Sequence, residues 1–173
     1  EELNLIARGI VKDDTNDSKQ LKIGYKLLYR ASEDGDDAEI FHQKCDGISG
    51  TLTVIKTKEG WIFGGYTTVT WDTDSEDEKK DANSFVFSIN LEKIYYVSEK
   101  KEYSIYCDSN KGPSFIGMFS IEESMLNMAN PVNPWGIQCY TGESLPCEIN
   151  GGKKEFYIEE LEVFQVIIKR NSD

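Results

Sequence analysis

Residues Thr51–Val69 decide the fold, and they read TLTVIKTKEGWIFGGYTTV. The first part is rich in β-branched side chains, Lys58-Glu59-Gly60 supplies a turn, and strand-forming residues resume at Trp61. Two such runs joined by a short turn predict a β-hairpin. Gly64 and Gly65 interrupt the second run, and adjacent glycines in a strand mark a bulge, a kink or a close approach by a neighbouring group. We expect a bend in the sheet there, in preference to a contact surface.

Further strands are expected on both sides of the hairpin, because several segments are short, apolar or aromatic, and separated by polar turn residues. They are Tyr25–Ala31, Ser84–Ile89, Ile94–Val97, Ser104–Asp108 and Glu155–Ile168. In the last segment the alternation of apolar residues changes phase near Glu159 and Glu160. This change predicts a bulge within one long strand.

Short helices are predicted at the margins of these strands, from helical spacing and capping residues. The first has Leu3, Ile6, Ala7 and Ile10 on one face; the second has Asp36 as N-cap, Glu39 reaching back and Gly47 after its end; the third begins at a capping box of Ser120 and Glu123 and places Ile121, Met125 and Met128 on one face. The methionines are expected to fill the core.

Together these elements predict a mainly β fold of the α+β type. Many short strands without β-α-β alternation favour a two-sheet antiparallel β-sandwich with short flanking helices. Residues 1–20 are expected to form an N-terminal helix and linker, and residues 21–173 the domain itself. The start at Glu1 instead of Met indicates a fragment of a longer protein.

Composition narrows the class of partner. The chain has 173 residues, with 31 acidic and 19 basic side chains and a net charge of −12, so attraction to nucleic acid or anionic lipid is disfavoured. No apolar run reaches the length that spans a bilayer, and the start does not resemble a signal peptide. We therefore expect a soluble, cytoplasmic, monomeric domain without membrane insertion.

The acidic run Asp72–Asp81 reads DTDSEDEKKD. Its polarity is typical of a solvated, mobile surface loop. The alternative is an acidic patch that docks a basic partner. A calcium loop is less favoured, because the glycine and the closing glutamate of an EF-hand are missing.

The cysteines suggest free thiols in a reducing compartment, because no C-x-x-C pair is present and the chain has a single histidine. His42 and Cys45 lie three residues apart on a predicted helix, a spacing that suits either packing or a thiol with its base. Packing is the preferred interpretation, and Cys45 is kept as a candidate redox thiol. A weaker alternative is carbohydrate stacking on a tryptophan. The other cysteines are Cys107, Cys139 and Cys147. The tryptophans that could stack on a sugar are Trp61, Trp71 and Trp135.

A series of motifs in this order resembles the TLDc domain family. They are Leu27-Leu28-Tyr29-Arg30-Ala31-Ser32, Phe41-His42, Cys45-Asp46-Gly47, Phe63-Gly64-Gly65-Tyr66, Asn150-Gly151-Gly152 and Glu160-Leu161-Glu162-Val163-Phe164. The resemblance extends from about Gly24 to Ile168. It differs from the family pattern after Phe115, where Ile116 precedes the expected glycine.

The resemblance implies a β-sandwich with flanking helices, a link to oxidative-stress resistance and, in several eukaryotic relatives, binding to the vacuolar proton-pumping ATPase. It implies no cofactor and no agreed catalytic mechanism. The positions of this sequence that match the family's glycine and acidic motif residues are Gly64, Gly65, Gly151, Gly152, Glu160 and Glu162. A structural role is preferred for all six, with Arg30 as counter-ion for the glutamates.

The function expected on this basis is a non-enzymatic protein-interaction domain. Its contacts are expected from the exposed loops at Asp72–Asp81 and around Met118. The alternative is a cysteine-based peroxide scavenger or another enzyme, which requires an accessible thiolate of low pKa.

Overall fold

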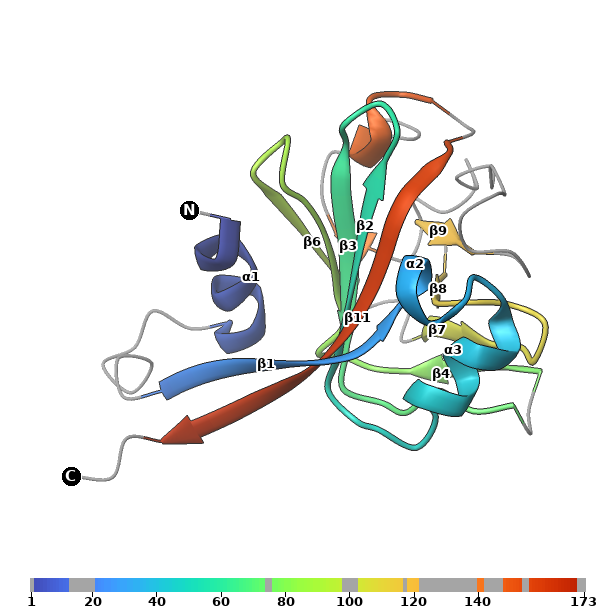
Figure 1. Ribbon diagram of the computed structural model, residues 1–173. Coiled ribbons are helices and arrows are strands. Elements are labelled where there is room, and N and C mark those ends of the chain that lie inside the picture. The colour runs from blue at the N-terminus through green and yellow to red at the C-terminus, as the bar shows by residue number, and fades with distance from the viewer. Residues whose placement is uncertain are drawn as a thin grey trace.

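A computed structural model describes residues 2–12, 21–73, 76–97, 103–116, 118–121, 140–141, 148–153 and 156–170. Its described strands form two antiparallel sheets (Figure 1). The larger sheet has the order β1 (Leu21–Arg30), β11 (Ile158–Arg170), β2 (Thr51–Thr57), β3 (Ile62–Thr67), β5 (Phe85–Ser88), β6 (Lys93–Val97) and β10 (Tyr140–Thr141). The smaller sheet has the order β4 (Asp77–Lys80), β7 (Tyr103–Cys107), β8 (Ser114–Phe115) and β9 (Phe119–Ser120).

The main core lies between the two sheets and contains many aromatic rings that pack against one another. Phe63 of β3 packs edge-on against Phe119 of β9 and against Phe156, at centroid distances of 5.6 and 5.2 Å. Trp71 packs against Phe115 at 5.9 Å. Large rings hold much apolar area and set the spacing of the sheets. The predicted two-sheet antiparallel sandwich is confirmed.

Short helices flank the sandwich, as expected. They are α1 (Glu2–Val11), α2 (Ala31–Asp34), α3 (Ala38–Cys45) and a 3₁₀ helix (Glu148–Asn150). Helix α3 begins one residue later than predicted, because the carboxylate of Asp37, and not that of Asp36, accepts the N–H of Ile40 at 3.1 Å. Helix α2 occupies residues expected to be the end of a strand and a turn. In the described part of the chain, no helix has the length and apolar character needed to cross a bilayer.

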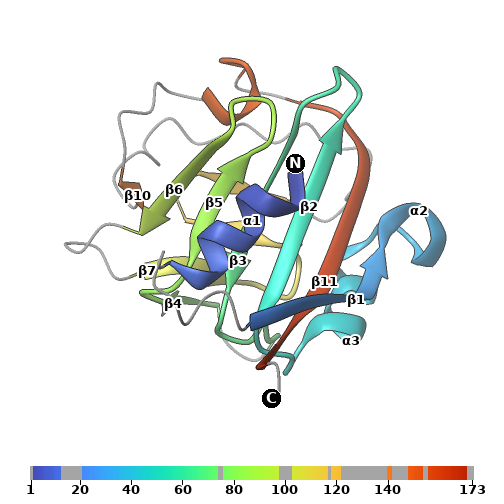
Figure 2. The same cartoon turned by 90° about the vertical axis from the view of Figure 1, so that its left-hand side faces the viewer.

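Helix α1 lies on the outer face of the larger sheet (Figure 2). Its Ile6 belongs to a second buried cluster with Leu52, Phe85 and Phe87. Gly9 allows the helix to lie directly on Phe85, since a Cβ at this position would be 2.6 Å from the ring. The expected apolar face is confirmed for Ile6, whereas Leu5 is also buried and Leu3 is 61% exposed.

The β2–β3 hairpin is confirmed, and of the alternatives for Gly64 and Gly65 the structure shows a close approach by neighbouring groups, without a bulge. The pairing of β2 with β3 is continuous, with Thr53 opposite Gly65. Successive residues of a strand face opposite sides of a sheet. A Cβ at Gly64 would be 2.9 Å from Phe87 on the outer face, and one at Gly65 would be 2.5 Å from Phe115 in the core. The two glycines therefore allow aromatic rings to cover β3 from both sides.

The bulge predicted in the last strand is confirmed. The register of β11 against β2 shifts between Ile158 and Glu160. Ile158 on one side of the shift and Leu161 and Val163 on the other are all buried. The extra residue turns both halves of β11 toward the same core.

The acidic run is not a simple mobile loop. Residues 77–80 form β4, which pairs with β7. Asp81 is 5% exposed, and its carboxylate accepts hydrogen bonds from the Thr67 hydroxyl, the Thr68 N–H and hydroxyl, and the Asn83 N–H at 2.6 to 2.9 Å. The expected solvated loop is wrong for these residues, because backbone groups of β4 pair with β7 and the Asp81 carboxylate has donors within the protein.

Two further expectations concern the chain after β8. Met118 is 5% exposed and belongs to the main core, so the exposed contact loop predicted around it is wrong. The hydroxyl of Ser120 lies 2.8 Å from that of Ser114. The rest of the predicted third helix, including Glu123, Met125 and Met128, lies outside the described residues, as does the predicted polar linker at residues 13–20.

Candidate functional site

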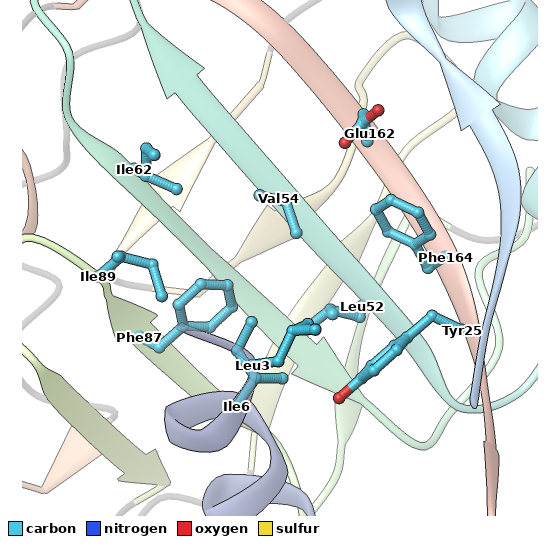
Figure 3. A pocket seen from close by; sticks show the side chains of 10 residues that line it. All are labelled: Leu3, Ile6, Tyr25, Leu52, Val54, Ile62, Phe87, Ile89, Glu162 and Phe164. Atoms are coloured by element: carbon cyan, nitrogen blue, oxygen red, sulfur yellow. The ribbon is translucent and has the colours of Figure 1, made fainter. Parts of the chain in front are cut away.

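An apolar groove lies on the outer face of the larger sheet, beside α1 (Figure 3). Its volume is about 220 Å³. The lining residues are Leu3, Ile6, Tyr25, Leu52, Val54, Ile62, Phe87, Ile89, Glu162 and Phe164. Pockets that enclose drug-sized ligands measure about 300–1,000 Å³. The groove is therefore suited to one or a few apolar side chains of a larger partner.

The groove exists because α1 covers only part of this sheet face. Ile6 of the helix and Phe87 of the sheet are buried in the same cluster, whereas Val54 and Phe164 are only half-buried. Leu3 projects from the first turn of α1 at the edge of the groove and is 61% exposed. An apolar surface of this kind is stabilised when a partner removes it from water.

Glu162, which lines the groove at one end, belongs to an ion pair (Figure 3). The Arg30 guanidinium contacts one carboxylate oxygen of Glu162 through Nη2 at 2.6 Å and through Nε at 2.7 Å. A second carboxylate, that of Glu33, lies 2.9 Å from Nη1, and hydrogen bonds to both glutamates raise the pKa of Arg30. The expected counter-ion role of Arg30 is confirmed for Glu162. Glu160 has a different partner, because its carboxylate accepts the N–H and the hydroxyl of Ser32.

Tyr25 lines the groove with its ring, and its hydroxyl is enclosed beside it. This oxygen is buried and has no partner among the described residues. Burial also raises the pKa of Tyr25, so the hydroxyl keeps its proton. An unpaired polar group costs about 1–3 kcal/mol in apolar surroundings.

The remaining family positions lie elsewhere in the fold. Gly151 and Gly152 form the turn after the 3₁₀ helix with φ of +63° and +81°, and a Cβ on Gly151 would be 2.5 Å from the Trp61 ring. Gly65 is covered by Phe115 in the core. Of the six positions, only Glu162 lines the groove, while Gly64 lets the Phe87 ring form its floor.

The candidate redox thiol is enclosed. Cys45 is fully buried, and burial raises the pKa of its thiol to about 12. His42 is not directed to it: Nδ1 lies 2.7 Å from the Asp46 carboxylate, and Nε2 lies 3.0 Å from the carbonyl oxygens of Asp108 and Lys111. This environment is unfavourable for a reactive thiolate.

The other candidates from the sequence are placed as follows. Cys107 is buried and its pKa is raised, while Cys139 and Cys147 lie outside the described residues. Trp71 is 1% exposed and donates to the Thr51 hydroxyl at 2.9 Å, so it cannot stack on a sugar. Trp61 is half-buried, and Trp135 is outside the described residues. Within the described ranges, no three acidic, histidine or cysteine side chains gather as metal ligands.

The fold is a two-sheet antiparallel β-sandwich, and its β2–β3 hairpin carries glycines where aromatic rings approach the strand. A family model described as the TLDc domain matches residues 13–167. The chain therefore belongs to the TLDc family. The matched region begins after α1, so the helix that forms one wall of the groove lies outside it. No curated protein matches the chain.

Proposed function

We propose that this chain is a non-enzymatic protein-interaction domain, and that the groove beside α1 receives apolar side chains of its partner. The observation that carries the proposal is a half-covered apolar sheet face with an exposed leucine at its edge. Isolated apolar residues are common on protein surfaces, but a contiguous apolar depression is typical of an interaction site.

The partner that we propose is the vacuolar proton-pumping ATPase, in keeping with the function implied by TLDc membership. The link to oxidative-stress resistance would then be indirect, acting through the pump in the cytoplasm and not through a thiol of this domain. The burial and raised pKa of Cys45 favour this indirect link over the alternative, in which the domain itself scavenges peroxide through a thiol. The net charge of −12 would favour approach to a basic region of the pump.

The test compares two substitutions on α1 that add the same charge. Leu3→Glu places a carboxylate at the edge of the groove, whereas Asn4→Glu places one on the next residue, which is exposed and does not line it. Binding to the purified cytosolic sector of the pump is measured for both variants and for the unmodified chain. We expect Leu3→Glu to weaken binding about tenfold or more, because an unpaired carboxylate is costly to bury. Asn4→Glu should bind like the unmodified chain.

The outcomes separate the partner from the site. If the unmodified chain does not bind the pump sector, the proposed partner is wrong. If it binds and both variants bind equally well, the groove is not the contact surface. Circular dichroism of each variant checks that α1 and the sandwich are retained.

A further inference from the structure

Strand β1 is one of the two outermost strands of the larger sheet as described, and β10 is the other. In the described part of the chain β1 pairs only with β11. Beyond Gln165, β11 has left β2, so residues 166–170 and 21–25 form a two-stranded ribbon that projects from the sandwich (Figure 1). The other side of β1 presents backbone N–H and C=O groups of an edge strand, which is a template for another strand.

The ribbon is basic in a strongly acidic protein. Lys22 and Lys169 of the ribbon and Lys26, which follows it in β1, are exposed, and Lys22 stands directly opposite Lys169 in the register. None of the three has an ion pair with any described residue. Like charges directly opposite one another destabilise a strand pair. An acidic partner would remove that repulsion.

Alternate residues of β1 are apolar, and Val166, Ile167 and Ile168 of β11 are all apolar. Ile23 and Leu27 of β1 face the same side as Tyr25, opposite Ile168 and Phe164 of β11. Leu27 and Ile168 are 39% and 48% exposed. Since Tyr25 and Phe164 also line the groove, this apolar stripe is continuous with it. The edge therefore presents lysines on one face and apolar side chains on the other.

We propose that the free edge of β1 over residues 21–27 binds an extended segment of a partner protein as an added strand, in which acidic and apolar residues alternate. The partner's backbone would pair with β1, its acidic side chains would face Lys22 and Lys26, and its apolar ones would continue the groove surface. A second copy of this chain is a poorer occupant, because two-fold pairing through β1 brings both sets of lysines to one face. Lysines on an edge strand can also serve only to prevent aggregation. The test therefore asks whether binding depends on the charge of the added strand.

The inference rests on the proposed function, since it describes a second contact of a protein partner, but its test does not use the pump. The probe is a capped eight-residue peptide of alternating Glu and Val, and the comparison peptide alternates Lys and Val. Binding is measured by fluorescence anisotropy with the full 173-residue chain. The charge-reversed variant carries Lys22→Glu and Lys26→Glu. The matched control carries Lys58→Glu and Lys153→Glu, the same charge change on exposed residues outside the ribbon.

We expect the unmodified chain and the control to bind the Glu-Val peptide, and the charge-reversed variant to bind it about tenfold or more weakly and to prefer the Lys-Val peptide. Hydrogen exchange should slow at the backbone amides of residues 21–27 when the peptide binds. Lack of binding, binding without that protection, or equal binding by the charge-reversed variant would each overturn the inference. So would self-association through β1 in sedimentation, or binding of the ribbon to phosphatidylserine vesicles in place of the peptide.

The two proposals fail separately. Loss of pump binding in Leu3→Glu together with no peptide binding leaves the proposed function intact and removes the edge-strand inference. Peptide binding at β1 by a chain that does not bind the pump retains the edge-strand site and removes the proposed partner.

Discussion

Gly64→Ala adds a single methyl group, and we expect it to lower the free energy of unfolding strongly. An ideal Cβ at Gly64 would lie 1.9 Å from the carbonyl oxygen of Thr53 and 2.9 Å from Phe87. The obstacle is the backbone of the neighbouring strand, so a change of rotamer cannot relieve the overlap. Strands β2 and β3 would have to separate locally in the middle of the sheet.

The expected cost follows from this geometry. Overpacking a core typically costs about 1–3 kcal/mol, and an obstructing backbone places Gly64→Ala near the upper end, at about 3 kcal/mol. For a domain of this size, 1 kcal/mol corresponds to about 2–4 °C in Tm, so we expect Tm to fall by about 6–12 °C. Gly24→Ala is the matched control, because its Cβ would lie 3.8 Å from the Ile167 carbonyl oxygen, an ordinary van der Waals distance. It should change the free energy of unfolding by less than about 1 kcal/mol.

The assay is urea unfolding followed by tryptophan fluorescence and circular dichroism, with the slope m compared among the variants. Trp71 is fully buried and reports on the loss of the core. If the free energies of unfolding of Gly64→Ala and Gly24→Ala agree within about 0.5 kcal/mol, the close approach of β2 to β3 does not constrain this position, and the reasoning is refuted.

Three further predictions use the same purified chain. The pKa of Asp34 is lowered, chiefly by the hydrogen bond from Lys44 at 2.7 Å, so its stabilising effect is present above the ordinary carboxyl pKa and lost as the pH falls through the lowered value. Asp34→Asn should therefore cost up to about 1 kcal/mol at neutral pH and little in acid; an equal cost at both pH values would argue against the pair. Cys45 should resist iodoacetamide in the folded chain and react in urea, as read by peptide mass spectrometry, and rapid labelling of the folded chain would show that the thiol is accessible. Asp81→Ala should lower the free energy of unfolding by about 3 kcal/mol, because the Thr68 N–H and hydroxyl lose their acceptor; a loss below about 0.5 kcal/mol would mean that water replaces the carboxylate.

The predictions that held depend on neighbours in the chain. The turn at Lys58-Glu59-Gly60 and the phase change near Glu159 are visible as residue types at short spacing, and the structure places a hairpin and a bulge at these points. The ion pair between Arg30 and Glu162 is an exception, since the two residues are far apart in sequence. It was predictable because a glutamate in an apolar strand needs a counter-charge.

The predictions that failed depend on distant segments. The acidic run forms β4 because β7 lies beside it, and the rings that approach Gly64 and Gly65 come from β5 and β8. One sequence pattern points to the apolar groove on the outer face of the larger sheet. In β2, Leu52 and Val54 stand on the face opposite Ile55, so both sides of this strand carry apolar side chains that require cover.

The sequence by itself determined the order of most strands, the hairpin, the bulge in β11 and membership of the TLDc family, because alternation, turn residues and motif order are properties of the linear chain. Only the tertiary structure decided how much of the outer sheet face α1 covers, which edge is left to β1, and that Cys45 is enclosed. Burial and strand pairing sum over contacts between segments far apart in sequence, and no local pattern specifies that sum.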